Sequence, residues 1–295
     1  MRKLSLILAL LLLFALPAHA EGAEHTEDEI YLKGLESTNR VVTVLGKTYL
    51  VFAQNSPEWG NLRSDNNLDN PAYVNVSACV PFTIANVTVN AIPYEKLPLV
   101  TNVMRSVPRI DRYTASTYYG RKTSERFEIK ENCDFLRYWP LLMVAIAAGN
   151  NQAYIDNPQS LFYVDVITRY FNIKLEECWI LDDAMEALDQ GALIMTNFHA
   201  DVDSYGNAIG HYFVFVGRDE EYAYMLDSNF MREFPLPMGY YVELVEPGVE
   251  RIRLENIYKV NLGQMLILWP LEDFTPYTAE RYQEILDESN NLLLQ

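Results

Sequence analysis

Cysteine, histidine and basic residues are scarce in this chain. Its 295 residues include 3 cysteines and 4 histidines, which excludes a dense disulfide scaffold and leaves few candidates for histidine-dependent chemistry. Lys and Arg number 23 against 40 Asp and Glu, giving a net charge of -17. This balance argues against nucleic acid as a partner, because phosphate binding requires clustered Lys and Arg. The 49% of hydrophobic residues indicates a folded protein.

The first twenty residues have the pattern of a secretory signal. Met1–Lys3 is basic, Leu4–Leu16 is almost entirely apolar, and Pro17–Ala20 ends in small residues. This pattern predicts cleavage after Ala20, and the apolar run is shorter than the roughly 20 residues that span a bilayer. We therefore expect a secreted or cell-envelope protein with no integral membrane segment once the signal, residues 1–20, is removed.

Helical patterns precede strand patterns in the rest of the chain. Residues 21–39 form an acidic leader, and residues 40–295 are expected to form one domain. Arg40–Phe52 predicts a hairpin around Gly46, whereas Pro81–Ile92 is compatible with helix or strand. Helices are predicted for Asp134–Gly149, Gln159–Phe171, Asp182–Asp189 and Thr278–Leu294. Strands are predicted for Ala192–Phe198, His211–Gly217, Tyr222–Asp227, Tyr240–Glu246, Arg251–Val260 and Gln264–Pro270. This order predicts an α+β fold with an antiparallel sheet.

A predicted hairpin brings a histidine and an aspartate together. His211 opens one strand and Asp227 closes the next, with a turn between them that we centre on Asp219. That register places His211 directly opposite Asp227, on one face of the pair. A carboxylate there can hold an imidazole in one tautomer and stabilise its protonated form. An ordinary surface hairpin with a polar end is the alternative.

Cys79 is the candidate nucleophile. It precedes Pro81 and an apolar segment, so it lies at a helix N-terminus if that segment is helical. The positive end of a helix dipole and a nearby imidazolium both lower the pKa of a thiol. The thiolate is the attacking species in cysteine-dependent hydrolysis. The alternative is a buried structural cysteine.

Three blocks of the sequence resemble one family. Gln54–Gly60 (QNSPEWG), Ser77–Ala85 (SACVPFTIA) and Gly210–Gly217 (GHYFVFVG), with Asp227 in the next strand, are similar to motifs of papain-like cysteine peptidases. The branch they resemble is that of the bacteriocin double-glycine leader-processing peptidases. The blocks occur in the family's order and span Gln54 to Asp227.

The resemblance implies a papain-like α+β fold and a role for each matched residue. Cys79 would be the nucleophile, His211 the general base and acid, and Asp227 the residue that orients His211. Gln54 and the backbone N–H of Cys79 would donate to the oxyanion. Donors of this kind are each worth roughly 2.7–4 kcal/mol in the transition state.

The sequence also departs from the family's pattern. Ala78 and Val80 replace the glycines that flank the nucleophile, and Ser228 replaces the proline after the orienting aspartate. A β-branched residue at position 80 is expected to narrow the cleft beside the thiol. Residues 93–134 have no counterpart in a minimal family member, and we interpret them as an insertion.

Other residues compete for these roles. Cys133 also precedes an apolar helical pattern, and His199 is the rival of His211 at the end of a predicted strand. Cys133 and Cys178 are either two buried thiols or a disulfide. Asn75 and Asn86 begin acceptor patterns for N-glycosylation, which we interpret as chance because both flank Cys79.

We therefore expect an exported cysteine peptidase or related amide hydrolase that works through a Cys-His-Asp triad and a thioester. Its partner would be a peptide or amide substrate, including peptides derived from the cell wall. No cofactor or metal motif is recognised. The alternatives are a catalytically inactive, peptidase-like binding module at the cell surface and a structural or adhesion domain.

Overall fold

The computed structural model describes residues 39–53, 79–100, 112–114, 126–128, 139–140, 143, 162–202, 208–228 and 241–292. The predicted signal and most of the predicted leader lie outside these residues. The same is true of Gln54, Asn75 and Cys133, and of much of the proposed insertion.

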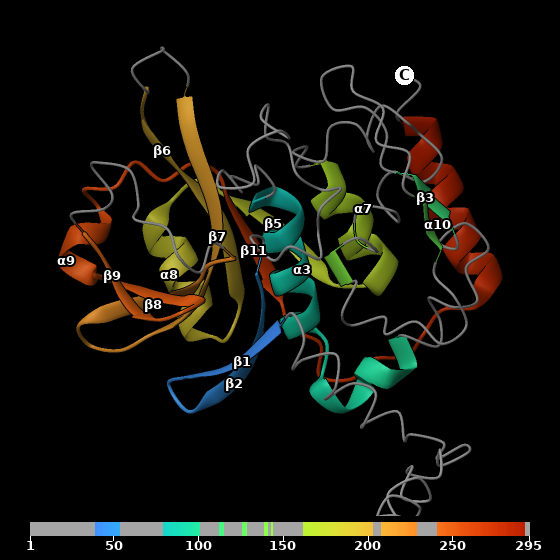
Figure 1. The fold of residues 1–295 in the computed structure, drawn as a ribbon, viewed down its shortest axis with the longest axis horizontal. Coiled ribbons are helices and arrows are strands. Elements are labelled where there is room, and N and C mark those ends of the chain that lie inside the picture. Colours follow the sequence, from blue (N-terminus) through green and yellow to red (C-terminus); the bar gives the residue numbers. More distant parts are fainter. Residues whose placement is uncertain are drawn as a thin grey trace, which may run out of the picture.

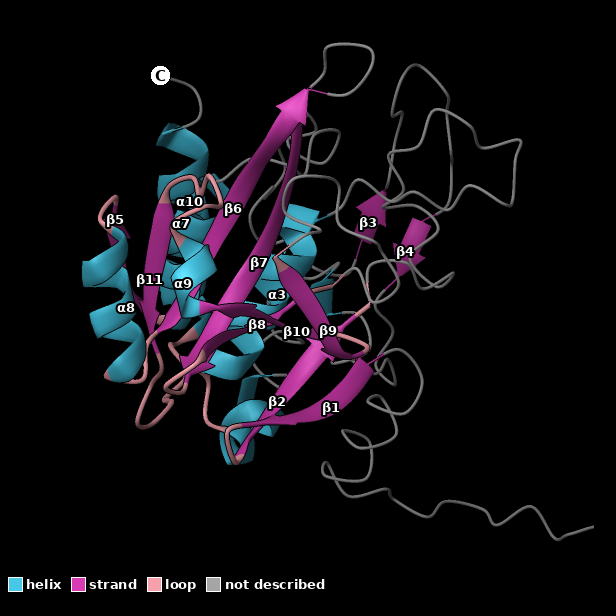
Figure 2. Cartoon of the chain, turned by 90° about the vertical axis from the view of Figure 1, so that its left-hand side faces the viewer, coloured by secondary structure: helices cyan, strands magenta, loops and turns pink. Residues whose placement is uncertain are grey.

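A seven-stranded antiparallel sheet forms the middle of the molecule, with the order β5-β11-β6-β7-β8-β10-β9. Its strands are β5 (Lys174–Cys178), β6 (Leu193–Val202), β7 (Ala208–Arg218), β8 (Tyr222–Leu226), β9 (Val242–Glu246), β10 (Val249–Arg253) and β11 (Met265–Trp269). The two longest, β6 and β7, run side by side beyond the other strands (Figure 2).

Helices cover both faces of this sheet (Figure 1). One side carries α3 (Cys79–Ala91), α7 (Phe162–Phe171) and α10 (Ala279–Leu292), and the other carries α8 (Leu181–Asp189). Alternate residues of β7 enter different cores: Val214 and Val216 pack in the core that contains α3, whereas Phe213 and Phe215 pack in the core that contains α8. Both faces are therefore apolar, as expected for a sheet covered on each side.

The predicted N-terminal hairpin is confirmed. Strands β1 (Asn39–Val44) and β2 (Lys47–Phe52) pair around Leu45 and Gly46, whose φ angles of 50° and 78° suit a two-residue hairpin turn. The hydroxyl of Tyr49 donates to the carbonyl oxygen of Val216 at 3.0 Å, so the hairpin is anchored to β7.

The expected insertion contributes short elements to the described part of the chain. These are the 3-10 helix η2 (Tyr94–Lys96) and the paired strands β3 (Arg112–Thr114) and β4 (Arg126–Glu128).

The α+β class is confirmed, and three details of the prediction are wrong. Strand β5 precedes α8, so the helices and strands are not fully separated along the chain. The predicted strand Arg251–Val260 ends at Arg253 and is followed by the short helix α9 (Leu254–Ile257). Strand β6 continues to Val202, which places His199 within the strand rather than at its end. None of the described helices is long and apolar enough to cross a membrane.

Candidate active site

Helix α3 places Cys79 at its first residue. The segment is helical although it is rich in β-branched residues, because it is buried along nearly its whole length; burial of this kind outweighs intrinsic propensity. Thr88, one of these residues, donates its hydroxyl to the carbonyl oxygen of Ile84 at 2.8 Å and accepts a bond from the indole N–H of Trp139. Cys79 is the half-buried end of this helix and forms no disulfide with another described residue.

A buried hydrogen bond fixes the start of α3 against the strand that carries His211. The hydroxyl of Thr83 donates to the carbonyl oxygen of Tyr212 at 3.0 Å, and Thr83 is only 1% exposed. Residues four apart on a helix lie on the same side, so Thr83 is one turn from Cys79. Tyr212 is the residue next to His211, and this bond therefore sets the spacing between the helix and the histidine strand.

Two asparagines of α3 hold the outer edge of β2. Asn90 bonds both the N–H and the carbonyl oxygen of Leu50, each at 2.8 Å, and Asn86 accepts the N–H of Phe52 at 2.8 Å. These amides satisfy edge groups of a two-stranded sheet. Because Asn86 precedes Asn90 in the helix, β2 runs along α3 towards the end that carries Cys79. Asn86 is also 1% exposed, which agrees with a chance match to the glycosylation pattern.

The hairpin between β7 and β8 exists, but its predicted register is wrong. Val214 pairs with Leu226 and Phe215 with Met225, and a bulge follows before Gly217. Extending this pairing places Asp227 two positions away from His211 along the neighbouring strand, a diagonal rather than a direct pair. The shift is even, so both side chains remain on one face. Diagonal neighbours are still within reach of each other.

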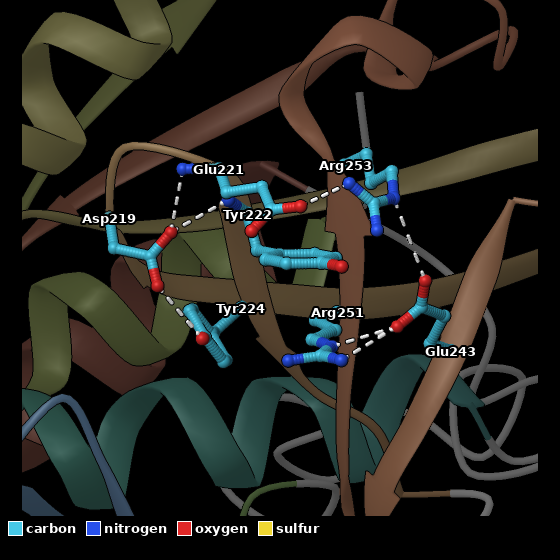
Figure 3. Close-up of polar contacts among 7 residues, drawn as sticks. All are labelled: Asp219, Glu221, Tyr222, Tyr224, Glu243, Arg251 and Arg253. Carbon is cyan, nitrogen blue, oxygen red and sulfur yellow. Dashed lines mark hydrogen bonds and ion pairs between the residues drawn. The ribbon is translucent and has the colours of Figure 1, made fainter.

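The side chain of Asp219 explains the shift in register (Figure 3). Its carboxylate accepts the N–H groups of Glu221 and Tyr222 at 2.8 and 2.7 Å and the hydroxyl of Tyr224 at 2.9 Å. Asp219 therefore begins the turn instead of occupying its centre, a common role for Asp.

An exposed group of side chains continues from this turn across β10 to β9 (Figure 3). Arg253 pairs with Glu221 and Arg251 with Glu243, and the guanidinium of Arg251 stacks 4.0 Å from the centre of the Tyr222 ring. These contacts link β8, β10 and β9 on the face opposite to the histidine and fix the position of the strand that leads to Asp227.

His211 and Asp227 form a buried ion pair. Nε2 of His211 lies 2.6 Å from Oδ1 of Asp227, and the side chains are 3% and 1% exposed. The backbone N–H of Asp227 donates to the carbonyl oxygen of Gly248 at 3.1 Å, which fixes the carboxylate. The imidazole also packs against the ring of Phe198, with centroids 6.2 Å apart.

The thiol of Cys79 forms a hydrogen bond with the same imidazole. Burial lowers the pKa of His211, but the charge of Asp227 and the hydrogen bonds to Asp227 and Cys79 outweigh burial and raise the pKa from 6.5 to about 10. Because Nε2 faces Asp227, Nδ1 is the nitrogen left for the sulfur. The imidazolium is therefore the stable form at neutral pH, and it lies between a thiol group and a carboxylate.

Sequence reasoning missed one member of this group. Glu250 of β10 is 4% exposed and interacts electrostatically with both Asp227 and His211. The alternation of residues in Val249–Arg253 could have indicated that Glu250 is buried, because Glu250 shares a face with Ile252, a core residue.

The remaining candidates are placed as follows. Cys178 is a free, buried thiol whose Sγ donates to the carbonyl oxygen of Ile180 at 3.1 Å. Val80 is 1% exposed and belongs to the main core, so its side chain does not line a surface beside the thiol. Gln54 and Cys133 lie outside the described residues. Within the described ranges, no group of three or more His, Cys, Asp and Glu residues is placed so that it could hold a metal ion.

Comparisons with family models, with curated proteins and with solved structures found no match to this chain. The geometry of Cys79, His211 and Asp227 is therefore the basis for a functional assignment.

Proposed function

We propose that this protein is an exported cysteine peptidase or related amide hydrolase with a papain-like arrangement of helix and sheet. The observation that carries the proposal is that two groups interact with the His211 imidazole: the Cys79 thiol at a helix N-terminus, and the Asp227 carboxylate 2.6 Å from its Nε2. A nucleophile, a base and a residue that orients the base are the parts that acyl transfer requires.

The reaction would proceed in two steps. The Cys79 thiolate attacks the amide carbonyl carbon, and an S–C bond forms while the carbonyl oxygen becomes an oxyanion. His211 gives its proton to the leaving nitrogen, the C–N bond breaks, and a thioester remains. A water molecule then attacks the thioester and loses a proton to His211, which releases the acid and restores the thiolate.

The oxyanion would be bound by the backbone N–H of Cys79 and by the side-chain amide of Gln54. The N–H of Cys79 belongs to the first turn of α3, and N–H groups at a helix N-terminus point towards a bound anion. The course of β2 supports a role for Gln54, because the bonds of Leu50 to Asn90 and of Phe52 to Asn86 direct this strand towards the start of α3.

The substrate class follows from the chemistry of the site and from the charge of the chain. A thiolate beside an imidazolium acts on peptide and amide carbonyls, and the net charge of -17 favours neutral or basic substrates, weakly at physiological salt. Peptides, including those of a cell wall exposed to an exported enzyme, meet this requirement.

Alkylation of Cys79 tests the proposal. Iodoacetamide labelling is followed by peptide mapping between about pH 5 and pH 9, and we expect rapid labelling of Cys79 already near pH 6, where an ordinary thiol with a pKa of about 8.5 is almost fully protonated. His211→Ala should return the profile to that of an ordinary thiol. The same ordinary profile in the unaltered protein would contradict the assignment as a cysteine-dependent enzyme and favour a binding module.

A further inference from the structure

A buried carboxyl group lies beside the His211–Asp227 pair. Glu250 faces Met225 across β8 and Leu244 across β9. Met225 precedes Asp227 by two residues, so Glu250 and Asp227 share one face of the sheet and are diagonal neighbours. Oε2 of Glu250 is fully buried, and no donor of the described residues bonds it.

The charges around Glu250 do not favour an ionised carboxylate. Of the described groups that face it, Asp227 is an anion and His211 is a cation already paired with Asp227. The two arginines of its own strand, Arg251 and Arg253, point to the opposite face and pair with other acids (Figure 3). An ionised Glu250 would thus be a second buried anion sharing one cation with Asp227, an arrangement that two neighbouring carboxyl groups avoid by retaining a proton.

We propose that Glu250 is a neutral carboxylic acid whose Oε2–H donates to Oδ2 of Asp227, so that it positions the carboxylate that holds His211. Oδ2 is the oxygen of Asp227 that does not face Nε2, and it is also buried. The positioning role rests on the proposed function, whereas the protonated state of Glu250 does not.

The electrostatics agree with this assignment. Burial, followed by the negative charge of Asp227, raises the pKa of Glu250 from 4.5 to about 10, although the charge of His211 opposes the change. A carboxyl group with a raised pKa binds more protons in the folded state than in the unfolded state. Its contribution to stability is therefore complete below about pH 4.5 and is lost as the pH rises towards 10.

The pH dependence of folding tests the protonated state without any substrate. Folding constants are measured by urea unfolding of the purified protein and of Glu250→Gln, which keeps the size and a donor but cannot ionise. If folded Glu250 keeps a proton that the unfolded chain has lost, the folding constant of the unaltered protein falls nearly tenfold for each pH unit, and that of the variant does not. The folding constant of the variant divided by that of the unaltered protein should therefore rise by at least about thirtyfold between about pH 5.5 and pH 7.5. Glu246→Gln, a half-buried carboxyl on the neighbouring strand, is the control and should give a nearly constant ratio.

Infrared difference spectra provide a second, direct measurement. The unaltered protein at about pH 7 should show the carbonyl band of a protonated carboxylic acid, and Glu250→Gln should lack it, because exposed carboxyl groups are ionised at that pH. A missing band together with a constant folding ratio would show that Glu250 is ionised and would overturn the proposal.

Alkylation of Cys79 then tests the positioning role. Glu250→Gln should retain the labelling profile of the unaltered protein, because its amide still donates to Asp227, whereas Glu250→Leu should slow labelling near pH 6 by at least about tenfold. Equal labelling of both variants would refute positioning. If the unaltered protein itself shows an ordinary thiol profile, the proposed function fails, while the folding and infrared measurements still decide the state of Glu250.

Discussion

His211 and Asp227 lie in contact although they are not opposite each other across the hairpin. Nε2 and Oδ1 are 2.6 Å apart, while the pairing of Val214 with Leu226 makes the two residues diagonal neighbours. The carboxylate therefore reaches along the sheet to the imidazole, and the backbone bond from Asp227 to Gly248 holds it in that direction. This geometry leaves Nδ1 of His211 for Cys79.

Asp227→Asn should keep the shape of the site and remove its charge. The charge of Asp227 is the largest cause that raises the pKa of His211, so the imidazolium should lose its proton at a lower pH in the variant. We expect NMR titration of His211 to show a lower pKa, and alkylation of Cys79 near pH 6 to slow by at least about tenfold. Asp189→Asn, which removes an exposed partner of Arg218, is the control. An unchanged titration in Asp227→Asn would show that Asp227 does not stabilise the imidazolium.

Thr83→Val should disturb the site through the position of α3. The variant loses the bond to the carbonyl oxygen of Tyr212 and leaves a buried acceptor unpaired, at a cost of about 1–3 kcal/mol in the free energy of unfolding. We expect slower alkylation of Cys79 as well, because this bond sets the spacing between the helix and β7. Thr196→Val, in β6, removes a hydroxyl that donates to the carbonyl oxygen of Gln264, and it should cost similar stability without slowing alkylation. Equal alkylation in the two variants would contradict the positioning argument.

Turn residues and hydrophobic patterns were enough to predict most elements of the fold. Gly46 marked the first hairpin, and the apolar strands from Ala192 onward form the sheet. Strand β5 was missed because its exposed edge contains Lys174, Glu176 and Glu177, a charged pattern that is typical of edge strands. Such a strand is recognisable only when its partner β11 is known.

The site was predicted in outline, and its details depend on contacts that the sequence does not specify. Motif residues identified Cys79, His211 and Asp227, which the structure brings together. The register depends on a bulge in β7 and on the carboxylate bonds of Asp219. Glu250 was missed because it lies among charged residues, and its burial comes from strands on both sides.

Val80→Ala should show whether the valine side chain packs in the core or restricts the cleft beside the thiol. Val80 is 1% exposed in the main core, so its truncation should lower the free energy of unfolding by about 2 kcal/mol. Alkylation of Cys79 should stay unchanged, because the valine side chain packs away from the solvent. Val245→Ala, at a position 48% exposed, should change neither quantity. Faster alkylation in Val80→Ala would show instead that this side chain restricts access to the thiol.

Thiol counting should distinguish the cysteines by burial. Cys178 is 9% exposed and its Sγ bonds the carbonyl oxygen of Ile180, so it should stay unreactive to a thiol reagent in the native protein while Cys79 reacts. After denaturation without reductant, we expect all 3 cysteines of the chain to react. A count of one, with Cys79 as the thiol that reacts, would show a disulfide between Cys133 and Cys178 and contradict the free thiol of Cys178.

Asn86→Ala and Asn90→Ala should release the first hairpin from α3 by different amounts. Asn86 satisfies the N–H of Phe52, whereas Asn90 satisfies both polar groups of Leu50, and each variant should lose about 1–3 kcal/mol of stability. Amide hydrogen exchange should become faster at Phe52 in the first variant and at Leu50 in the second, because each amide loses its acceptor. If the hairpin directs Gln54 to the oxyanion, turnover of a peptide substrate should fall more in Asn86→Ala, whose bond lies nearer to the start of the helix. Loss of turnover in Asn90→Ala alone would contradict that path of the chain.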